Sequence, residues 1–131
     1  MYDIAVASLA LGVERKWLDN LLSQHDIPGV EHVARGVTRK LSTRALVTAA
    51  AVRDLQRRLG VPAGRAVELA AHVVAASHHR VELSPALTIH LDLTTLERDL
   101  ERRLVHAMET AVPRRRGRPA ADRHQRRRGT P

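Results

Sequence analysis

The sequence of 131 residues contains no cysteine and no phenylalanine, and Tyr2 and Trp17 are its only large aromatic side chains. The missing cysteine excludes disulfide bonds, thiol chemistry and cysteine-ligated zinc. With so few aromatics, a core has to be built from Leu, Val, Ile and Ala, which favours helices over a β-sandwich. The same shortage disfavours RNA recognition by stacking of bases on aromatic rings.

Long apolar runs and a basic leader pattern are missing as well. No stretch of apolar residues approaches the length of a membrane span. The N-terminus lacks the positively charged region of a secretory signal. We therefore expect a cytoplasmic protein with no membrane partner, either associated with a bacterial nucleoid or encoded by a phage.

Motifs of catalysis and of cofactor binding are absent too. The chain has no glycine-rich phosphate loop, no nucleophile elbow and no pair of carboxylates in an apolar setting. Its eight histidines have no cysteine companions and no helical i, i+4 pairing, so we expect solvated or hydrogen-bonded side chains rather than metal ligands. The sequence predicts no enzyme, no metal and no cofactor.

What the sequence does contain is a strong asymmetry of charge. Residues 113–131 hold eight arginines and one acid, Asp122, so this segment carries +7 of the formal net charge of +8. The residues before it are almost neutral. A polycationic tail on a neutral body predicts a polyanionic partner, and nucleic acid is the commonest one. Because the tail has no apolar periodicity, we expect it to be disordered in isolation.

Apolar spacing and turn residues over the first part of the chain predict a mainly α fold. The segment 30–41 is the exception, and it favours a hairpin around Arg35-Gly36. The predicted elements are a helix over 4–11 with Asp3 as N-cap and Gly12 at its end, a helix over 14–23, the hairpin, a helix through Leu59 that Ser42 or Thr43 caps and Gly60 ends, and a helix over 62–77.

The pattern changes after residue 77. Residues 87–93 alternate apolar and polar side chains, which predicts a half-buried strand, and Val81 with Leu83 indicates a shorter strand before it. Thr94-x-x-Glu97 has the form of a capping box, and it predicts the start of a last helix that Pro113 ends.

The strand and helix over 78–112 both require a facing surface, because a two-stranded hairpin is marginal in water. We expect a second copy to supply it, giving a two-fold dimer suited to a palindromic DNA site, and we expect Leu100→Glu to make the protein monomeric. Packing onto the chain's own helices over 45–77 is the alternative. The predicted interface residues are Leu87, Ile89, Leu91, Leu96, Leu100, Leu104 and Met108.

Residues 1–44 have the layout of a winged helix-turn-helix, in which a short helix braces a second one that enters the major groove. The second helix carries polar residues opposite Trp17, Leu18, Leu21 and Leu22, and Arg, Lys and Asn are suited to bases or phosphates. Asp19 could accept from a cytosine amino group or orient Arg15. The predicted DNA-binding residues are Arg15, Lys16, Asp19 and Asn20 on this helix and Arg35, Arg39, Lys40 and Arg44 around the wing.

These residues resemble a known family. Ala7-x-x-x-Leu11-Gly12-Val13, the helix from Trp17 to Leu22, and Gly36 with Arg39 before Leu41-Ser42 are similar to the MerR-type and excisionase-like winged helix-turn-helix over roughly residues 2–75. The resemblance implies duplex-DNA binding, with Arg15, Lys16 and Asn20 at the groove and Arg39 in the wing. It does not imply metal sensing, because the chain has no cysteine effector site and no long coiled-coil helix.

The basic tail contains a second motif. Arg116-Gly117-Arg118-Pro119, preceded by Arg114 and Arg115, resembles the AT-hook core, in which Arg-Gly-Arg enters the narrow minor groove of A·T tracts. The alternative is a basic segment that contacts phosphates without sequence preference.

We expect a mainly α protein with a winged helix-turn-helix and supporting helices over 1–77, a strand-helix dimerisation or partner-binding element over 78–112, and the tail over 113–131. The expected function is that of a sequence-specific, repressor-like regulator that binds double-stranded DNA. Two alternatives stay open. One is an antitoxin whose strand and helix neutralise a toxin protein, and the other is an architectural DNA binder that relies on the tail.

Overall fold

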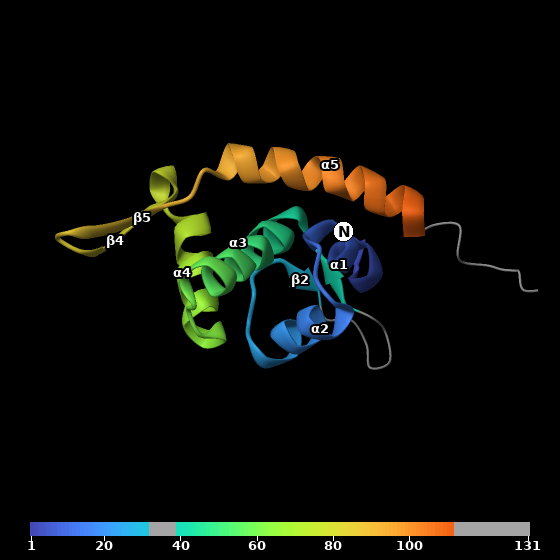
Figure 1. Cartoon of the computed structure of the whole chain (residues 1–131), viewed down its shortest axis with the longest axis horizontal. Helices are drawn as coiled ribbons and strands as arrows, with labels where there is room; N and C mark the ends of the chain where they lie inside the picture. Colours follow the sequence, from blue (N-terminus) through green and yellow to red (C-terminus); the bar gives the residue numbers. More distant parts are fainter. Residues whose placement is uncertain (32–38, 112–131) are drawn as a thin grey trace, which may run out of the picture.

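The computed structural model describes residues 1–31 and 39–111, in which five α-helices accompany two small antiparallel sheets (Figure 1). The chain in these ranges is therefore mainly helical, as its aliphatic composition predicted. Within the described ranges, no helix combines the length and apolar character that crossing a membrane requires.

The first two helices are separated by a glycine turn. Helix α1 spans Ile4–Leu11, and Asp3 Oδ1 accepts a hydrogen bond of 2.9 Å from the amide of Val6, which caps its N-terminus. Gly12 adopts a left-handed conformation with φ of 69°, and its amide donates to the carbonyl of Leu9. Helix α2 spans Arg15–Gln24. Both elements and both caps of α1 confirm the prediction to within one residue.

The first sheet joins the N-terminus to the hairpin that follows α2. Strands β1 (Tyr2–Asp3), β2 (Val30–Glu31) and β3 (Lys40–Leu41) form the order β1-β3-β2, with both pairs antiparallel. Leu41 is fully buried because β3 lies in the middle of the sheet and leads directly into a helix. The outer part of the predicted hairpin, with Arg35, lies outside the described residues.

Two helices connected by a short turn form the middle of the chain. Helix α3 spans Thr43–Leu59, and Ser42 Oγ accepts from the amide of Ala45 at 3.1 Å. Gly60 ends α3 in the left-handed region, and α4 spans Ala63–Ala75 after Pro62. A single turn of 3₁₀-helix at Ser77–His79 follows α4. Helix α4 is thus slightly shorter than predicted.

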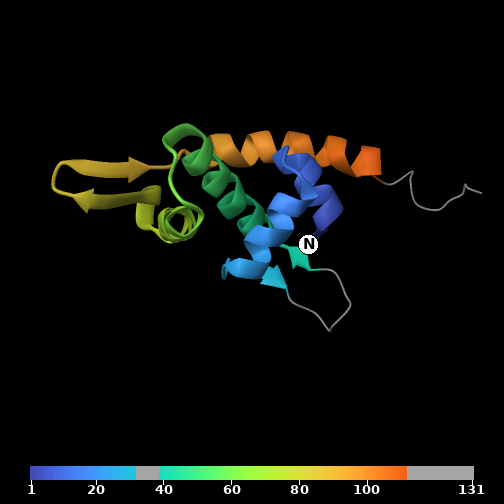
Figure 2. The same ribbon diagram turned by 60° about the horizontal axis from the view of Figure 1, so that its bottom comes forward.

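A second hairpin projects from the rest of the molecule (Figures 1 and 2). It consists of β4 (Arg80–Ser84) and β5 (Leu87–His90), which pair antiparallel. The predicted strand over 87–93 is therefore too long. It is also less buried than predicted, since Leu87 is 54 % exposed.

The last helix begins differently from the prediction. Helix α5 spans Leu93–Ala111, and the side chain of Asp92 caps it: Oδ1 accepts from the amide of Thr95 at 3.1 Å, and Oδ2 accepts from Thr95 Oγ1 at 2.9 Å. The predicted capping box at Thr94 is therefore wrong. An Asp three residues before a backbone amide satisfies the free donor of the first turn, and Asp92 occupies that position.

Helix α5 lies across α1 and α3 (Figures 1 and 2) and completes their core. Leu100, Leu104 and Ala107 are buried in one cluster with residues of α1 such as Ala7 and Leu11. The expectation that Leu100 and Leu104 face a partner is corrected by this packing, since α1 and α3 already cover them. The core thus includes residues of α5 together with residues of α1 and α3.

Candidate nucleic-acid interface

The polar face of α2 is fully accessible. Leu18, Leu21 and Leu22 are buried against the core, and Trp17 is half-buried beside them. The opposite side of the helix carries four exposed side chains, which the sequence predicted to share a face: Arg15, Lys16, Asp19 and Asn20. Their common orientation follows from the spacing of 3.6 residues per turn.

The N-terminal end of α2 carries two basic residues and has no side-chain cap. Glu14 is the N-cap residue, but its side chain makes no capping hydrogen bond, and the first turn contains no acid. Arg15 and Lys16 occupy that turn instead. The free amides and the helix dipole already make such an end positive, so two further cations there are unfavourable unless an anion is bound. A phosphate group is the ligand that best satisfies such an end.

An ion pair fixes α2 to the base of the first hairpin. Arg39 Nη1 lies 3.3 Å from Asp19 Oδ1, and the two side chains are 30 % and 60 % exposed. Among the described residues, the buried Nε of Arg39 has no hydrogen-bond partner. The sequence placed Asp19 beside Arg15 or at a base; the structure instead joins it to a residue twenty positions later. Asp19 therefore positions Arg39.

The other predicted cationic residues near the hairpin differ in their exposure to solvent. Lys40 is half-buried on β3, opposite Asp3 of β1 and Glu31 of β2 in the sheet register. Arg44 is exposed in the first turn of α3. The remaining predicted DNA-binding residues lie outside the described residues: Arg35, Arg114, Arg115, Arg116, Gly117 and Arg118.

The residues predicted to face a partner fall into separate groups. Leu87 and Met108 are 54 % and 47 % exposed, while Leu100 and Leu104 are buried at 3 % and 5 %. The half-buried members of the predicted interface are Ile89, Leu91 and Leu96.

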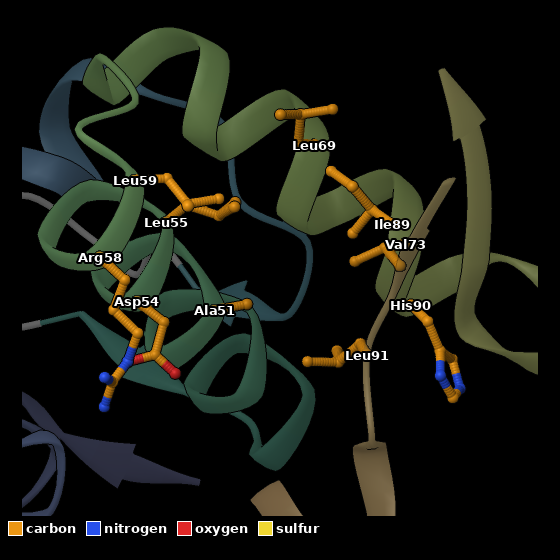
Figure 3. A pocket seen from close by; sticks show the side chains of 10 residues that line it. All are labelled: Ala51, Asp54, Leu55, Arg58, Leu59, Leu69, Val73, Ile89, His90 and Leu91. Carbon is orange, nitrogen blue, oxygen red and sulfur yellow. The ribbon is translucent and has the colours of Figure 1, made fainter. Parts of the chain in front are cut away.

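An apolar groove of about 300 Å³ lies at the foot of the second hairpin. Its walls come from α3 with Leu55 and Leu59, from α4 with Leu69 and Val73, and from the end of β5. Figure 3 shows Ile89 and Leu91 on the side of these helices, whereas His90 turns away from them. The groove thus continues the apolar side of the hairpin onto the body of the protein.

Comparison with known proteins identifies no similar protein. No family model, no curated protein and no solved structure matches this chain. The function therefore has to be argued from these residues and their placement.

Proposed function

We propose that this protein is a regulator that binds double-stranded DNA through a winged helix-turn-helix formed by α1, α2 and the β1-β3-β2 sheet. The observation that carries the proposal is the exposed face of α2, with Arg15 and Lys16 at an uncapped helix N-terminus. In this arrangement α2 enters the major groove and the base of the hairpin lies against the backbone.

The side chains of α2 have different roles in this proposal. Asn20 can pair with the edge of an adenine, and Arg15 can pair with a guanine. Lys16 neutralises a phosphate near the helix N-terminus. Asp19 holds Arg39, which donates to the backbone beside the groove. Sequence preference therefore depends on Arg15 and Asn20, and orientation depends on Lys16 and Arg39.

The arginine-rich tail adds affinity. Each phosphate that a cation neutralises releases counterions, so binding weakens steeply as salt is added. We expect deletion of 113–131 to flatten the dependence of log K on log salt by several units and to leave sequence preference unchanged. An unchanged slope would exclude the tail from the DNA complex.

Selection from random duplex DNA tests the proposal. The full chain is compared with Arg15→Ala and Asn20→Ala, and Arg65→Ala on α4 is the matched control because its exposed side chain pairs with Glu68 of the same helix. We expect one motif to be enriched by the full chain and by the control, and each α2 variant to lose about 1–3 kcal/mol at one base position. Enrichment of the same motif by all of these proteins would exclude α2 as the reading element.

The exposed second hairpin favours an additional function, which is binding to another protein chain. Its two faces differ: Val81 lies opposite Ile89 on the apolar face, while Arg80 and Glu82 lie opposite His90 and Thr88 on the polar face. The apolar face extends beyond the body, where Leu83 and Leu87 are 37 % and 54 % exposed. An exposed, amphipathic two-stranded arm is suited to covering by another chain. We propose a second copy as its first partner, because a two-fold dimer matches a palindromic site.

Sedimentation of the full chain distinguishes the possible partners. Leu100→Glu does not test dimerisation, since Leu100 is buried in the core of its own chain. We expect wild-type protein to be dimeric at micromolar concentration, Leu87→Glu to be monomeric, and the control Val105→Glu, which alters an exposed side chain of α5, to stay dimeric. A wild-type monomer that co-purifies with the product of a neighbouring, toxic reading frame would favour the antitoxin instead.

A further inference from the structure

Four arginines surround a cleft between α3 and α5. Arg53, Arg57 and Arg58 come from α3, and Arg103 comes from α5. The cleft consists of two cavities of about 160 Å³ each, which share Arg53, Asp54 and Arg58 in their linings. The first cavity lies between α3 and α5 and includes Arg103, whereas residues of α3 alone, with Arg57, line the second. The side of the first cavity that faces the core is apolar, with Leu96 and Leu100 among its residues.

The acids in the cleft do not balance these cations. Asp54 lies 3.6 Å from Arg58, and Asp99 lies 2.9 Å from Arg102 and 3.3 Å from Arg103. Within the part of the chain that the structure describes, neither Arg53 nor Arg57 has a carboxylate within 4.0 Å. The cleft therefore has an excess of positive charge, and that excess is centred on Arg53 and Arg57.

The surroundings of Arg53 disfavour the charge of its guanidinium group. Partial burial, followed by the charge of Arg57, lowers the pKa of Arg53, and the more distant Arg103 and Arg58 act in the same direction. Asp54 acts in the opposite direction. Arginine stays charged nonetheless, so the repulsion is not relieved by loss of a proton. A bound anion would relieve it, and burial strengthens such an interaction relative to bulk water.

We infer that this cleft binds a phosphate group at Arg53, which lines both cavities. Arg103 of α5 lies beside Arg53 in the first cavity, and Arg57 of α3 lies beside it in the second. The planar guanidinium group offers paired hydrogen-bond donors that match two phosphate oxygens, so the site should bind phosphate in preference to a halide ion. The phosphate comes either from the DNA backbone or from a small phosphorylated molecule.

The position of the cleft links it to the helix pair at the N-terminus. Leu11 lines the first cavity, and a Cβ atom placed on Gly12 would lie 3.9 Å from Nη1 of Arg103. Gly12 begins the turn between α1 and α2. A phosphate held by Arg103 would therefore sit beside the turn that orients α2, although the site itself does not depend on DNA binding by α2.

Thermal unfolding of the full chain provides the first experiment, with pyrophosphate added against sodium chloride of equal ionic strength. We expect pyrophosphate at saturation to raise the Tm of wild-type protein by about 4 °C or more. The variants Arg53→Gln and Arg57→Gln should lose this rise, and Arg65→Gln, an exposed arginine of α4, should keep it. Arg57 is exposed, so its replacement leaves the core intact. An equal rise in all four proteins would overturn the inference.

Binding to a short duplex of arbitrary sequence identifies the source of the phosphate. If DNA supplies it, Arg53→Gln and Arg57→Gln also weaken duplex binding and reduce the salt slope by about one unit each. If a small molecule supplies it, duplex binding is unchanged and the Tm effect is present. If the variants keep both the rise in Tm with pyrophosphate and the wild-type affinity for the duplex, the inference is overturned. This outcome is independent of whether α2 binds DNA.

Discussion

The two hairpins of this protein differ in the burial of their apolar side chains, and the sequence patterns of the strands do not predict this difference. The strands β2 and β3 are two residues long, yet Leu41 of β3 is fully buried. The strands β4 and β5 are longer and better patterned, yet Leu83 and Leu87 are exposed. The first hairpin has β1 on the far side of β3 and α3 directly after it, whereas the second has helix packing only near its foot. Burial of a strand thus depends on what covers it rather than on its own alternation.

Leucine-to-alanine substitutions should show this difference most strongly. We expect Leu41→Ala to lower the free energy of unfolding by about 3 kcal/mol, because it leaves a cavity in the core. Leu87→Ala removes a side chain that is 54 % exposed and should cost less than about 0.5 kcal/mol in the monomer. Urea unfolding at a protein concentration low enough to keep the chain monomeric measures both. Equal losses under that condition would show that other parts of the same chain cover the second hairpin.

The second largest effect concerns the glycine that precedes β2. Gly29 has φ of 92°, and a Cβ atom there would overlap Ser42 Oγ and crowd the amide of Ala45. We expect Gly29→Ala to cost about 2–3 kcal/mol, since it combines a strained backbone with disruption of the α3 cap.

Gly64→Ala in α4 is the matched control. A Cβ atom there would meet only His25 Cε1, at 3.8 Å, so this change should be neutral or stabilising by up to about 1 kcal/mol. A loss at Gly64 equal to that at Gly29 would point to a general effect of the added methyl group.

A smaller effect is expected at the residue that joins the first hairpin to its helix. Ser42 Oγ accepts from Ala45, and the Ser42 amide donates to the carbonyl of Gly29 at 2.9 Å. Ser42→Ala keeps the second bond and removes the first, which should cost about 1 kcal/mol. Thr43→Ala, at an exposed neighbouring position, should change stability by less than about 0.5 kcal/mol. Chemical denaturation of the two variants in parallel checks this expectation.

The smallest effect belongs to the corresponding residue after the second hairpin. Hydrogen bonds from the Thr95 amide and hydroxyl hold the pKa of Asp92 below its ordinary value of 3.8. A carboxyl whose pKa is lower in the folded state stabilises the fold above its unfolded pKa, and this contribution is lost as the pH falls through the folded pKa.

We therefore expect wild-type protein to be slightly more stable than Asp92→Asn at pH 6. The difference should shrink as the pH drops below about 3.8. Unfolding curves between pH 6 and pH 2 measure it, and a difference independent of pH would contradict a role for the charged carboxylate.

The sequence predicted those features that short-range rules control. Asp3 and Gly12 at the ends of α1, and Ser42 and Gly60 at the ends of α3, are found where cap chemistry places them. The start of α5 was misplaced because Thr94 and Glu97 fit a capping pattern equally well. Only the backbone path after β5 shows that Asp92 is the cap.

Long-range packing could not be predicted in the same way. An apolar stripe such as Leu96, Leu100 and Leu104 shows that a helix face will be covered, but it does not identify the covering surface. The pairing of Asp19 with Arg39, and the meeting of Arg53 with Arg103, likewise join residues far apart in the chain. The candidate face on α2 was predictable because a single helical period defines it.

The packing of α5 over α1 has a consequence for how the protein is made. Ala7 and Leu11 leave the ribosome about 90–100 residues before Leu104 and Ala107, which cover them in the core. Protein synthesis proceeds at about 5–20 residues per second, so the N-terminal helices remain uncovered by α5 for several seconds. The protein should therefore complete its core only after synthesis has passed α5, and ribosome-bound chains that stop before residue 93 should be sensitive to protease.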